Sequence, residues 1–276
     1  MTVDLDDLMD FAVRTAESAG QVTLKHFGSA AVTFKGDGSE LTAADTAAEE
    51  SIRSAIAERY PAHGILGEEG ARVEAASQYR WIVDPIDGTR SFAAGVPLYG
   101  VLLAVEKEGI PLLGCCHFPA LGQTVVAATG AGCWSAEREV RVSECDRIED
   151  ARIVTSGLEY WRDWATPLGR AGFDNLVGRC RFARTWGDCY GYILVATGRA
   201  EIHADPACGA IWDYAPMLPI LEEAGGRFST LRNEPVRAWS SALASNRILH
   251  QIAVDCWSGA SEEQIQTPLV RSRASL

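Results

Sequence analysis

Two aspartates, Asp84 and Asp87, follow a short apolar run in segment 81–89, which reads Trp-Ile-Val-Asp-Pro-Ile-Asp-Gly-Thr. The apolar run predicts the end of a buried strand, and Pro85 restricts the backbone between the two acids. Two buried carboxylates this close repel each other and lose hydration, so they require a compensating positive charge. Mg²⁺ can supply that charge, because it takes carboxylate and carbonyl ligands and leaves room for a substrate phosphate. The segment therefore predicts a metal-and-phosphate site.

The composition is that of a globular protein with an acidic surface. A chain of 276 residues is long enough to bury a large core. Its residues are 47% hydrophobic and 22% charged, which is typical of a globular protein. The net charge is −12 and the pI is about 4.9. Nucleic acid and anionic membranes both require a basic face, so we expect neither as a partner.

The eight cysteines form no Cys-x-x-Cys pair, and no histidine stands at ligand spacing. This pattern argues against a zinc site and against a secreted disulfide framework. The first residues, Met-Thr-Val-Asp-Leu-Asp-Asp, are acidic where a signal peptide would be basic and then apolar. The apolar run over 96–105 is too short to cross a bilayer. We therefore expect a cytoplasmic protein.

The spacing of apolar residues predicts an alternation of helices and strands. We expect helices over 4–27, 42–60, 186–198 and 212–223, strands over 33–35, 63–66, 98–128 and 200–204, and a hairpin turn over 106–109. Thr42 is a suitable helix cap, and Gly225-Gly226 ends the last of these helices.

The helix–strand alternation becomes more α/β in character near residue 145. We expect one unit over 1–276 with two approximate halves, an antiparallel-sheet α+β part over 1–145 and an α/β part over 146–258. The polar stretch 259–276 is expected to be a loose tail.

Further acids fall at the ends of expected elements, with Glu68 after a strand, Asp213 at a helix start and Asp45 near another helix start. Each has an ordinary alternative: a solvated turn acid for Glu68, a helix cap for Asp213 and a first-turn helix acid for Asp45. As a set with the aspartates of 81–89, they match what a two- or three-metal phosphoesterase requires. In such a site one metal acidifies a water, and another stabilises the leaving oxygen.

Three blocks resemble the inositol-monophosphatase-like, Mg²⁺-dependent phosphatases. They are Gly67-Glu68-Glu69, Asp84-Pro-Ile-Asp87-Gly-Thr89, and Trp212-Asp213 with the helix that runs to Gly225-Gly226. With the blocks in order, the similarity extends over residues 5 to 255. The resemblance implies a layered α-β-α-β-α sandwich, two or three Mg²⁺ ions, a small phosphate-ester substrate and a homodimer.

The resemblance also implies roles for individual residues. It implies metal ligands at Glu68, Asp84, the Ile86 carbonyl, Asp87 and Asp213, with Asp213 also near the substrate. Thr89 and Asp45 match the pair that orients and deprotonates the attacking water, and Glu69 matches an acid that holds a further water. The amides of Gly88 and Thr89 match phosphate donors, which a helix beginning at this point would leave free. Lys35 matches the basic residue of a loop near the metals.

The substrate is expected to be selected by segment 184–192, Arg-Thr-Trp-Gly-Asp-Cys-Tyr-Gly-Tyr. The inositol enzymes typically carry small neutral residues at this helix start, whereas Asp188 suits an ammonium or imidazolium group. The segment and Ser91 resemble the histidinol-phosphate phosphatases, and Asp205 stands slightly displaced from the acid with which the inositol enzymes bind ring hydroxyls. Asp188 can instead be a helix cap, and Arg184 can meet either the phosphate or a neighbouring acid.

Histidinol phosphate is thus the expected substrate, which places the enzyme in histidine biosynthesis. An inositol-1-monophosphatase or a broad sugar-phosphate phosphatase is the alternative within the family. A phosphatase-like binding protein without activity is the alternative from another class, and it would have little reason to keep so costly a cluster of acids. No Gly-x-Gly-x-x-Gly follows an expected strand near the N-terminus, so a nucleotide-binding oxidoreductase is not expected.

Overall fold

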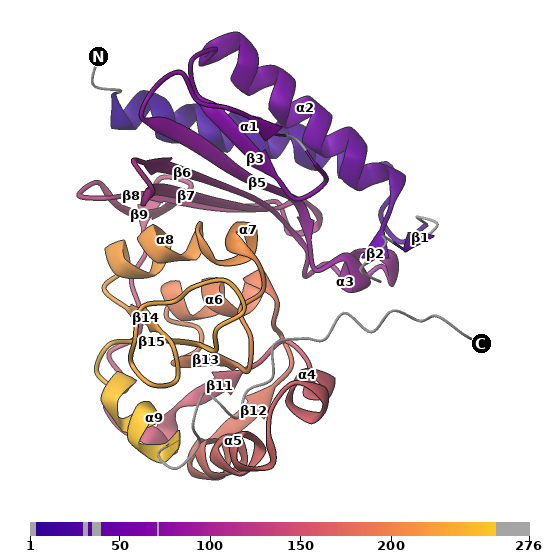
Figure 1. Ribbon diagram of the computed structural model, residues 1–276. Coiled ribbons are helices and arrows are strands. Elements are labelled where there is room, and N and C mark those ends of the chain that lie inside the picture. The colour runs from indigo at the N-terminus through magenta and orange to yellow at the C-terminus, as the bar shows by residue number, and fades with distance from the viewer. Residues whose placement is uncertain (1–3, 30–32, 35–39, 71, 258–276) are drawn as a thin grey trace.

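The computed structural model describes residues 4–29, 33–34, 40–70 and 72–257. Helices and sheets alternate in five layers, which confirms the sandwich that the family resemblance implies (Figure 1). The helices are α1 Leu5–Leu24, α2 Ala43–Arg59, α3 Thr89–Ala93, α4 Leu158–Asp163, α5 Pro167–Arg179, α6 Cys189–Ala196, α7 Ile211–Tyr214, α8 Met217–Glu223 and α9 His250–Trp257. Across the described residues, every helix is too short or too polar to cross a bilayer.

The larger sheet has eight strands in the order β10-β9-β8-β7-β6-β5-β3-β4. Its strands are β3 Gly64–Gly67, β4 Arg72–Val73, β5 Tyr79–Asp87, β6 Gly100–Lys107, β7 Ile110–Phe118, β8 Gln123–Ala128, β9 Gly132–Ser135 and β10 Arg138–Glu139. Only the β3–β5 pair is parallel among the described strands of this sheet. Strands β1 Thr33–Phe34 and β2 Glu40–Leu41 form a separate antiparallel pair.

The smaller sheet has five strands in the order β12-β11-β13-β15-β14. They are β11 Arg152–Val154, β12 Phe182–Arg184, β13 Ile202–Asp205, β14 Arg227–Ser229 and β15 Ala242–Ser245. Strand β11 runs parallel to β12 and β13, whereas β15 is antiparallel to both of its neighbours.

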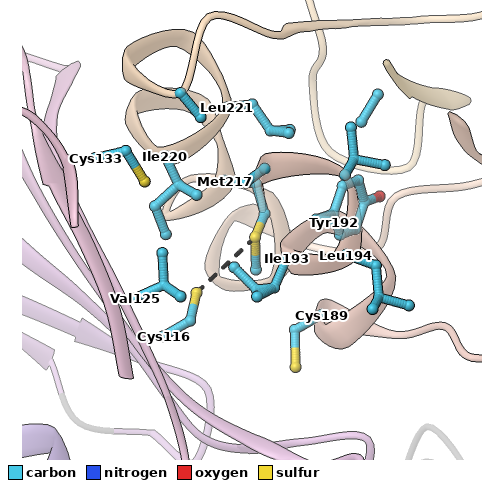
Figure 2. Packing of buried hydrophobic residues seen from close by; sticks show 14 of the residues in the cluster. Cys116, Val125, Cys133, Cys189, Tyr192, Ile193, Leu194, Met217, Ile220 and Leu221 are labelled. Atoms are coloured by element: carbon cyan, nitrogen blue, oxygen red, sulfur yellow. Dashed lines mark hydrogen bonds between the residues drawn. The ribbon is translucent and has the colours of Figure 1, made fainter. Parts of the chain in front are cut away.

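The three largest buried clusters lie between the layers. Helices α1 and α2 pack on one face of the larger sheet, and α6, α7 and α8 fill the space between the two sheets (Figure 1). Helices α5 and α9 pack against each other on the outer face of the smaller sheet. The middle cluster is rich in sulfur, with the Cys116 thiol 3.9 Å from the Met217 thioether (Figure 2). All eight cysteines carry free thiols.

The helix starts follow the expected capping chemistry. Thr42 caps α2, and its N–H and hydroxyl both donate to the Asp45 carboxylate, at 2.8 and 2.6 Å. These bonds satisfy groups that the first helical turn cannot pair internally. The sequence thus placed α1 and α2 correctly to within a few residues.

Two local expectations were wrong. The helix expected over 212–223 is divided into α7 and α8, because Pro216 has no N–H to continue the first helix. Strand β5 does not end before the acids but continues to Asp87, with an irregular register between Asp84 and Asp87. The hairpin turn expected over 106–109 is confirmed, and Glu108 and Gly109 form its two-residue loop with φ angles of 53° and 83°.

The close approach of α8 to the larger sheet can be tested at Gly114 on β7. A Cβ on Gly114 would collide with the Pro216 carbonyl, so Gly114→Ala should lower the free energy of unfolding by about 1–3 kcal/mol. Gly178 in α5 is the matched control, because no atom lies within 4 Å of its built Cβ. Gly178→Ala should instead raise stability by about 1 kcal/mol through helix propensity. Urea unfolding of both variants measures the difference, and equal effects would contradict the packing.

Candidate metal and phosphate site

Three acidic side chains meet between the larger sheet and the middle helices. Asp84 and Asp87 lie on β5 and Asp213 lies on α7, and carboxylate oxygens of the three lie within 4.8 Å of one another. Helix α7 packs against β5, which brings Asp213 to acids that are more than 120 residues away in sequence. In a regular strand, residues three positions apart point to opposite faces of the sheet. The irregular register of β5 between Asp84 and Asp87 lets both carboxylates join the same cluster.

Glu68 joins this cluster through the parallel pairing of β3 with β5. The Glu68 N–H donates to the Val83 carbonyl at 3.1 Å, so the end of β3 lies beside the acidic part of β5. A hydrogen bond between the Glu68 and Asp84 carboxyl groups contributes to the raised pKa of Asp84. The alternative of a fully solvated turn acid is therefore wrong for Glu68, which is half-buried.

Burial and mutual repulsion dominate the electrostatics of the cluster. Burial is the main cause that raises the pKa of Asp84 and of Asp213 well above 3.8, and the neighbouring carboxylates raise both further. Burial also raises the pKa of Asp87, against hydrogen bonds from Cys189 that lower it. Carboxylates gathered in this way require a cation to be stably ionised. Oxygen ligands of this kind match what Mg²⁺ prefers, so the residues present fit that ion.

Cys189 holds the Asp87 carboxylate in place. Its N–H, at the start of α6, donates to Asp87 Oδ2 at 2.7 Å, and its buried thiol also hydrogen-bonds to Asp87. Sequence reasoning did not identify Cys189, because the two residues are 102 positions apart. The only available signal was its place beside Asp188 in segment 184–192.

Glu49 on α2 is a second residue that the sequence did not reveal. Its buried carboxylate accepts the Glu69 N–H at 2.8 Å and therefore fixes the backbone just after Glu68. A Cβ on Gly67 would collide with the Glu49 carboxylate, so only glycine allows this approach. Close packing against Glu49 therefore explains why glycine stands at position 67, in the first of the three blocks that carry the family resemblance.

Asp45 and Thr89 lie near the acids with well-defined partners. Asp45 is buried in the first turn of α2, so its alternative as a first-turn helix acid is correct. Burial is the main cause that raises its pKa, the Thr42 hydrogen bonds lower it, and Glu68 raises it. The Thr89 hydroxyl donates to the Ile86 carbonyl at 3.2 Å. The water-activating role of the pair stays a prediction.

Gly88 and Thr89 form the turn from β5 into α3. Gly88 precedes α3 with a left-handed φ of 79°, a conformation that suits glycine. Because α3 begins at Thr89, the N–H groups of its first turn have no partner within the helix. The Gly88 and Thr89 amides follow Asp87 directly in the chain, and their role as phosphate donors stays a prediction.

Asp188 lies directly across from this turn. Its Oδ2 is 3.3 Å from the position that a Cβ on Gly88 would occupy. Burial is the main cause that raises the pKa of Asp188 to about 8, and Asp87 and Asp205 raise it further. Asp188 occupies the N-cap position of α6, as the alternative interpretation expects, but its carboxylate makes no capping hydrogen bond to the helix.

Several other expected residues have different surroundings. Asp213 is the third residue of α7 rather than its cap, and its carboxylate accepts the Ala210 N–H at 2.6 Å. The Arg184 guanidinium donates to the Ala183 carbonyl and lies over the Phe182 ring. Lys35 lies outside the described residues.

The protein-family comparison agrees with this geometry. The model of the inositol monophosphatase family matches residues 4–262. The chain belongs to the inositol monophosphatase family. It is a phosphoric monoester hydrolase, and enzymes of this family are generally Mg²⁺-dependent.

Individual relatives cover nearly the whole chain. A histidinol-phosphatase of Chlorobaculum parvum is 41% identical over 90% of this chain and 96% of its own length. A histidinol-phosphatase of Mycobacterium tuberculosis is 34% identical over 89% of this chain and 95% of its own. The solved IMPase of Thermotoga maritima matches with a TM-score of 0.83 and 27% identity, over 93% of this chain and 99% of that one.

Repulsion within the cluster predicts how metal-free stability depends on pH. With EDTA at pH 7, Asp84→Asn should melt a few degrees above wild type, since about 1 kcal/mol corresponds to roughly 2–4 °C at this size. The pKa of Asp84 is raised in the folded chain, so the destabilising charge is present above the raised pKa and disappears as the pH falls toward 3.8.

The melting difference between variant and wild type should therefore shrink from pH 7 toward pH 4. Scanning fluorimetry over this range measures it, and Mg²⁺ at pH 7 should stabilise wild type more than the variant. A difference that does not change with pH would contradict repulsion as the cause.

Proposed function

We propose that this phosphatase hydrolyses histidinol phosphate to histidinol, with Asp188 recognising the cationic part of the substrate. The observation that carries the proposal is the Asp188 carboxylate facing Gly88, at the edge of the acidic cluster. A phosphate held by the turn at Gly88 would place the rest of the ester within reach of Asp188. Although burial raises the pKa of Asp188 to about 8, a bound ammonium or imidazolium group would favour the ionised carboxylate, which binds such a group better than a neutral polyol.

The identity of the relatives supports the same substrate. Two proteins named histidinol-phosphatase are 41% and 34% identical to this chain over most of its length. Histidinol phosphate carries both an amine and an imidazole, so it offers the positive charge that Asp188 would bind. This substrate places the reaction in histidine biosynthesis. An inositol phosphatase or a broad phosphatase remains the alternative outcome of the substrate test below.

We assign two or three Mg²⁺ ions to the acidic cluster. The proposed ligands are the carboxylates of the clustered acids and one backbone oxygen: Glu68, Asp84, the Ile86 carbonyl, Asp87 and Asp213. The support is the clustered, mutually repelling set of acids, of which Asp84 is buried and Asp87 and Asp213 are half-buried, with raised pKa values. When bound, Mg²⁺ supplies positive charge for the phosphate and lowers the pKa of water.

The remaining residues would bind the phosphate and manage one proton. The amides of Gly88 and Thr89 donate to phosphate oxygens, at the start of α3. Thr89 and Asp45 orient the attacking water and accept its proton, and the raised pKa of Asp45 makes its carboxylate a stronger base. Glu69 holds a further water. Attack on phosphorus in line with the ester bond releases the alcohol, without a covalent phospho-enzyme.

Some expectations remain predictions that the described contacts do not strengthen. These are the substrate role of Asp213, the phosphate contact of Arg184, the loop role of Lys35, the division into two halves near residue 145, the homodimer and the cytoplasmic location.

The catalytic assignment predicts that removing one carboxylate stops turnover. Asp84→Asn and Asp87→Asn should each lower kcat by at least about 10²-fold with saturating Mg²⁺, because each removes charge needed in the transition state. Circular dichroism should show an intact fold. Full activity in either variant would contradict the assignment, whereas Mg²⁺ binding by wild type without hydrolysis of any ester would support a binding protein.

The substrate assignment predicts a selective loss in Asp188→Asn. Phosphate release with Mg²⁺ is compared for histidinol phosphate and inositol 1-phosphate. Wild type should favour histidinol phosphate, and Asp188→Asn should lower kcat/KM for that substrate about 10- to 100-fold, as expected for a lost charge-assisted hydrogen bond.

Asp255→Asn provides the matched control, because Asp255 is an exposed acid on α9 that bonds only to Gln251 among the contacts seen. It should leave both rates unchanged. A wild-type preference for inositol 1-phosphate, or an unchanged preference in Asp188→Asn, would refute the charge-recognition argument and leave the metal assignment intact.

A further inference from the structure

Asp205 is a buried acid at the end of β13 whose carboxylate is fully engaged. It is 3% exposed. Its Oδ1 accepts the Thr155 hydroxyl at 2.7 Å and the Ser156 N–H at 2.9 Å. Its Oδ2 accepts the Ser156 hydroxyl at 2.5 Å and pairs with His203 Nε2 at 2.8 Å. With its oxygens occupied in this way, Asp205 is not free to bind a substrate hydroxyl.

Ser156 links Asp205 to the substrate side of the site. Its hydroxyl donates to Asp205 and accepts the Asp188 N–H at 2.9 Å. The contact is close because Gly187 packs directly on the Ser156 backbone, where any Cβ at position 187 would collide. A continuous chain of hydrogen bonds therefore runs from Asp205 through Ser156 to the backbone of Asp188.

The backbone of Asp188 requires such support. Its φ of 49° and ψ of −149° lie in a region that residues with a side chain rarely adopt. A conformation of this kind persists only when its surroundings determine it. Two other bonds help, since the Gly191 N–H donates to the Asp188 carbonyl at 3.1 Å and the Cys189 N–H donates to Asp87. The Ser156 hydroxyl holds the remaining backbone group of the residue, its N–H.

We propose that Asp205 is a positioning residue, which acts through Ser156 to hold Asp188 in the strained backbone that points its carboxylate toward Gly88. The proposal rests on the proposed function, since it concerns how the recognition residue is aimed. It assigns Asp205 a role in selecting the leaving group, without contact to the substrate. Ionised Asp205 suits this role because it accepts hydrogen bonds from both the hydroxyl and the N–H of Ser156.

The test breaks the hydrogen-bond chain between Asp205 and the Asp188 N–H and leaves the Asp188 carboxylate in the protein. Ser156→Ala deletes the hydroxyl, whereas Asp205→Asn keeps the shape of the side chain and removes its charge. Thr155→Val is the matched control, because it breaks one bond to Asp205 and one from Trp161 but does not touch Asp188. Melting temperatures verify folding, and Ser156→Ala decides the question if Asp205→Asn does not fold.

Two measurements test whether Asp205 and Ser156 position Asp188. A crystal structure of Ser156→Ala should show residue 188 outside the positive-φ region. The kcat/KM preference for histidinol phosphate over inositol 1-phosphate should fall about fivefold to tenfold in Ser156→Ala and Asp205→Asn, mostly through KM for histidinol phosphate, as for loss of one hydrogen bond. Thr155→Val should keep the substrate preference within about twofold of wild type, even if its melting temperature falls as much as that of Ser156→Ala.

The inference is overturned if residue 188 keeps its positive φ in Ser156→Ala. It is also overturned if wild type prefers histidinol phosphate and Ser156→Ala retains that preference, or if Thr155→Val loses as much preference as Ser156→Ala. A wild type without the preference would refute the proposed function instead, and the backbone of residue 188 in Ser156→Ala then decides the positioning role.

Discussion

Repulsion among buried carboxylates is the constraint on which the arrangement of this structure depends. The parallel pairing of β3 with β5 brings Glu68 beside Asp84, and the packing of α7 on β5 brings in Asp213. Each carboxylate brought into the cluster increases the free-energy cost of ionising the other acids, and this contributes to the raised pKa values of Asp84 and Asp213. A cation bound by the folded chain would offset that cost, so folding and metal binding are coupled.

The regular elements could be predicted because their signals are local. The apolar spacing of α1 and the Thr42 cap of α2 lie within a few residues of the structures that they specify. The errors arose where a local signal had two meanings. Pro216 fits the first turn of a helix but here separates α7 from α8, and the acids after an apolar run suggested the end of a strand that in fact continues.

The residues of the site likewise include some that local sequence predicts and others that only the fold brings together. The acids of 81–89 stand in one short segment, so their chemistry could be inferred from spacing alone. Cys189, Glu49 and Ser156 act on residues 102, 20 and 32 positions away, and no sequence period joins such pairs. The sequence indicates Asp205 only as a displaced acid, because its hydrogen bonds depend on the pairing of β11 with β13, which are distant in the chain.

The two sheets supply different parts of the site. Asp84 and Asp87 belong to the larger sheet, whereas Ser156 and Asp205 follow or end strands of the smaller one. The turn before α6 contacts both, because Cys189 bonds to Asp87 and Asp188 bonds to Ser156. Changes in the smaller sheet can therefore redirect Asp188, the proposed recognition residue, and leave the acids of β5 where they are. A single fold can in this way keep one hydrolytic centre and change the alcohol that it releases.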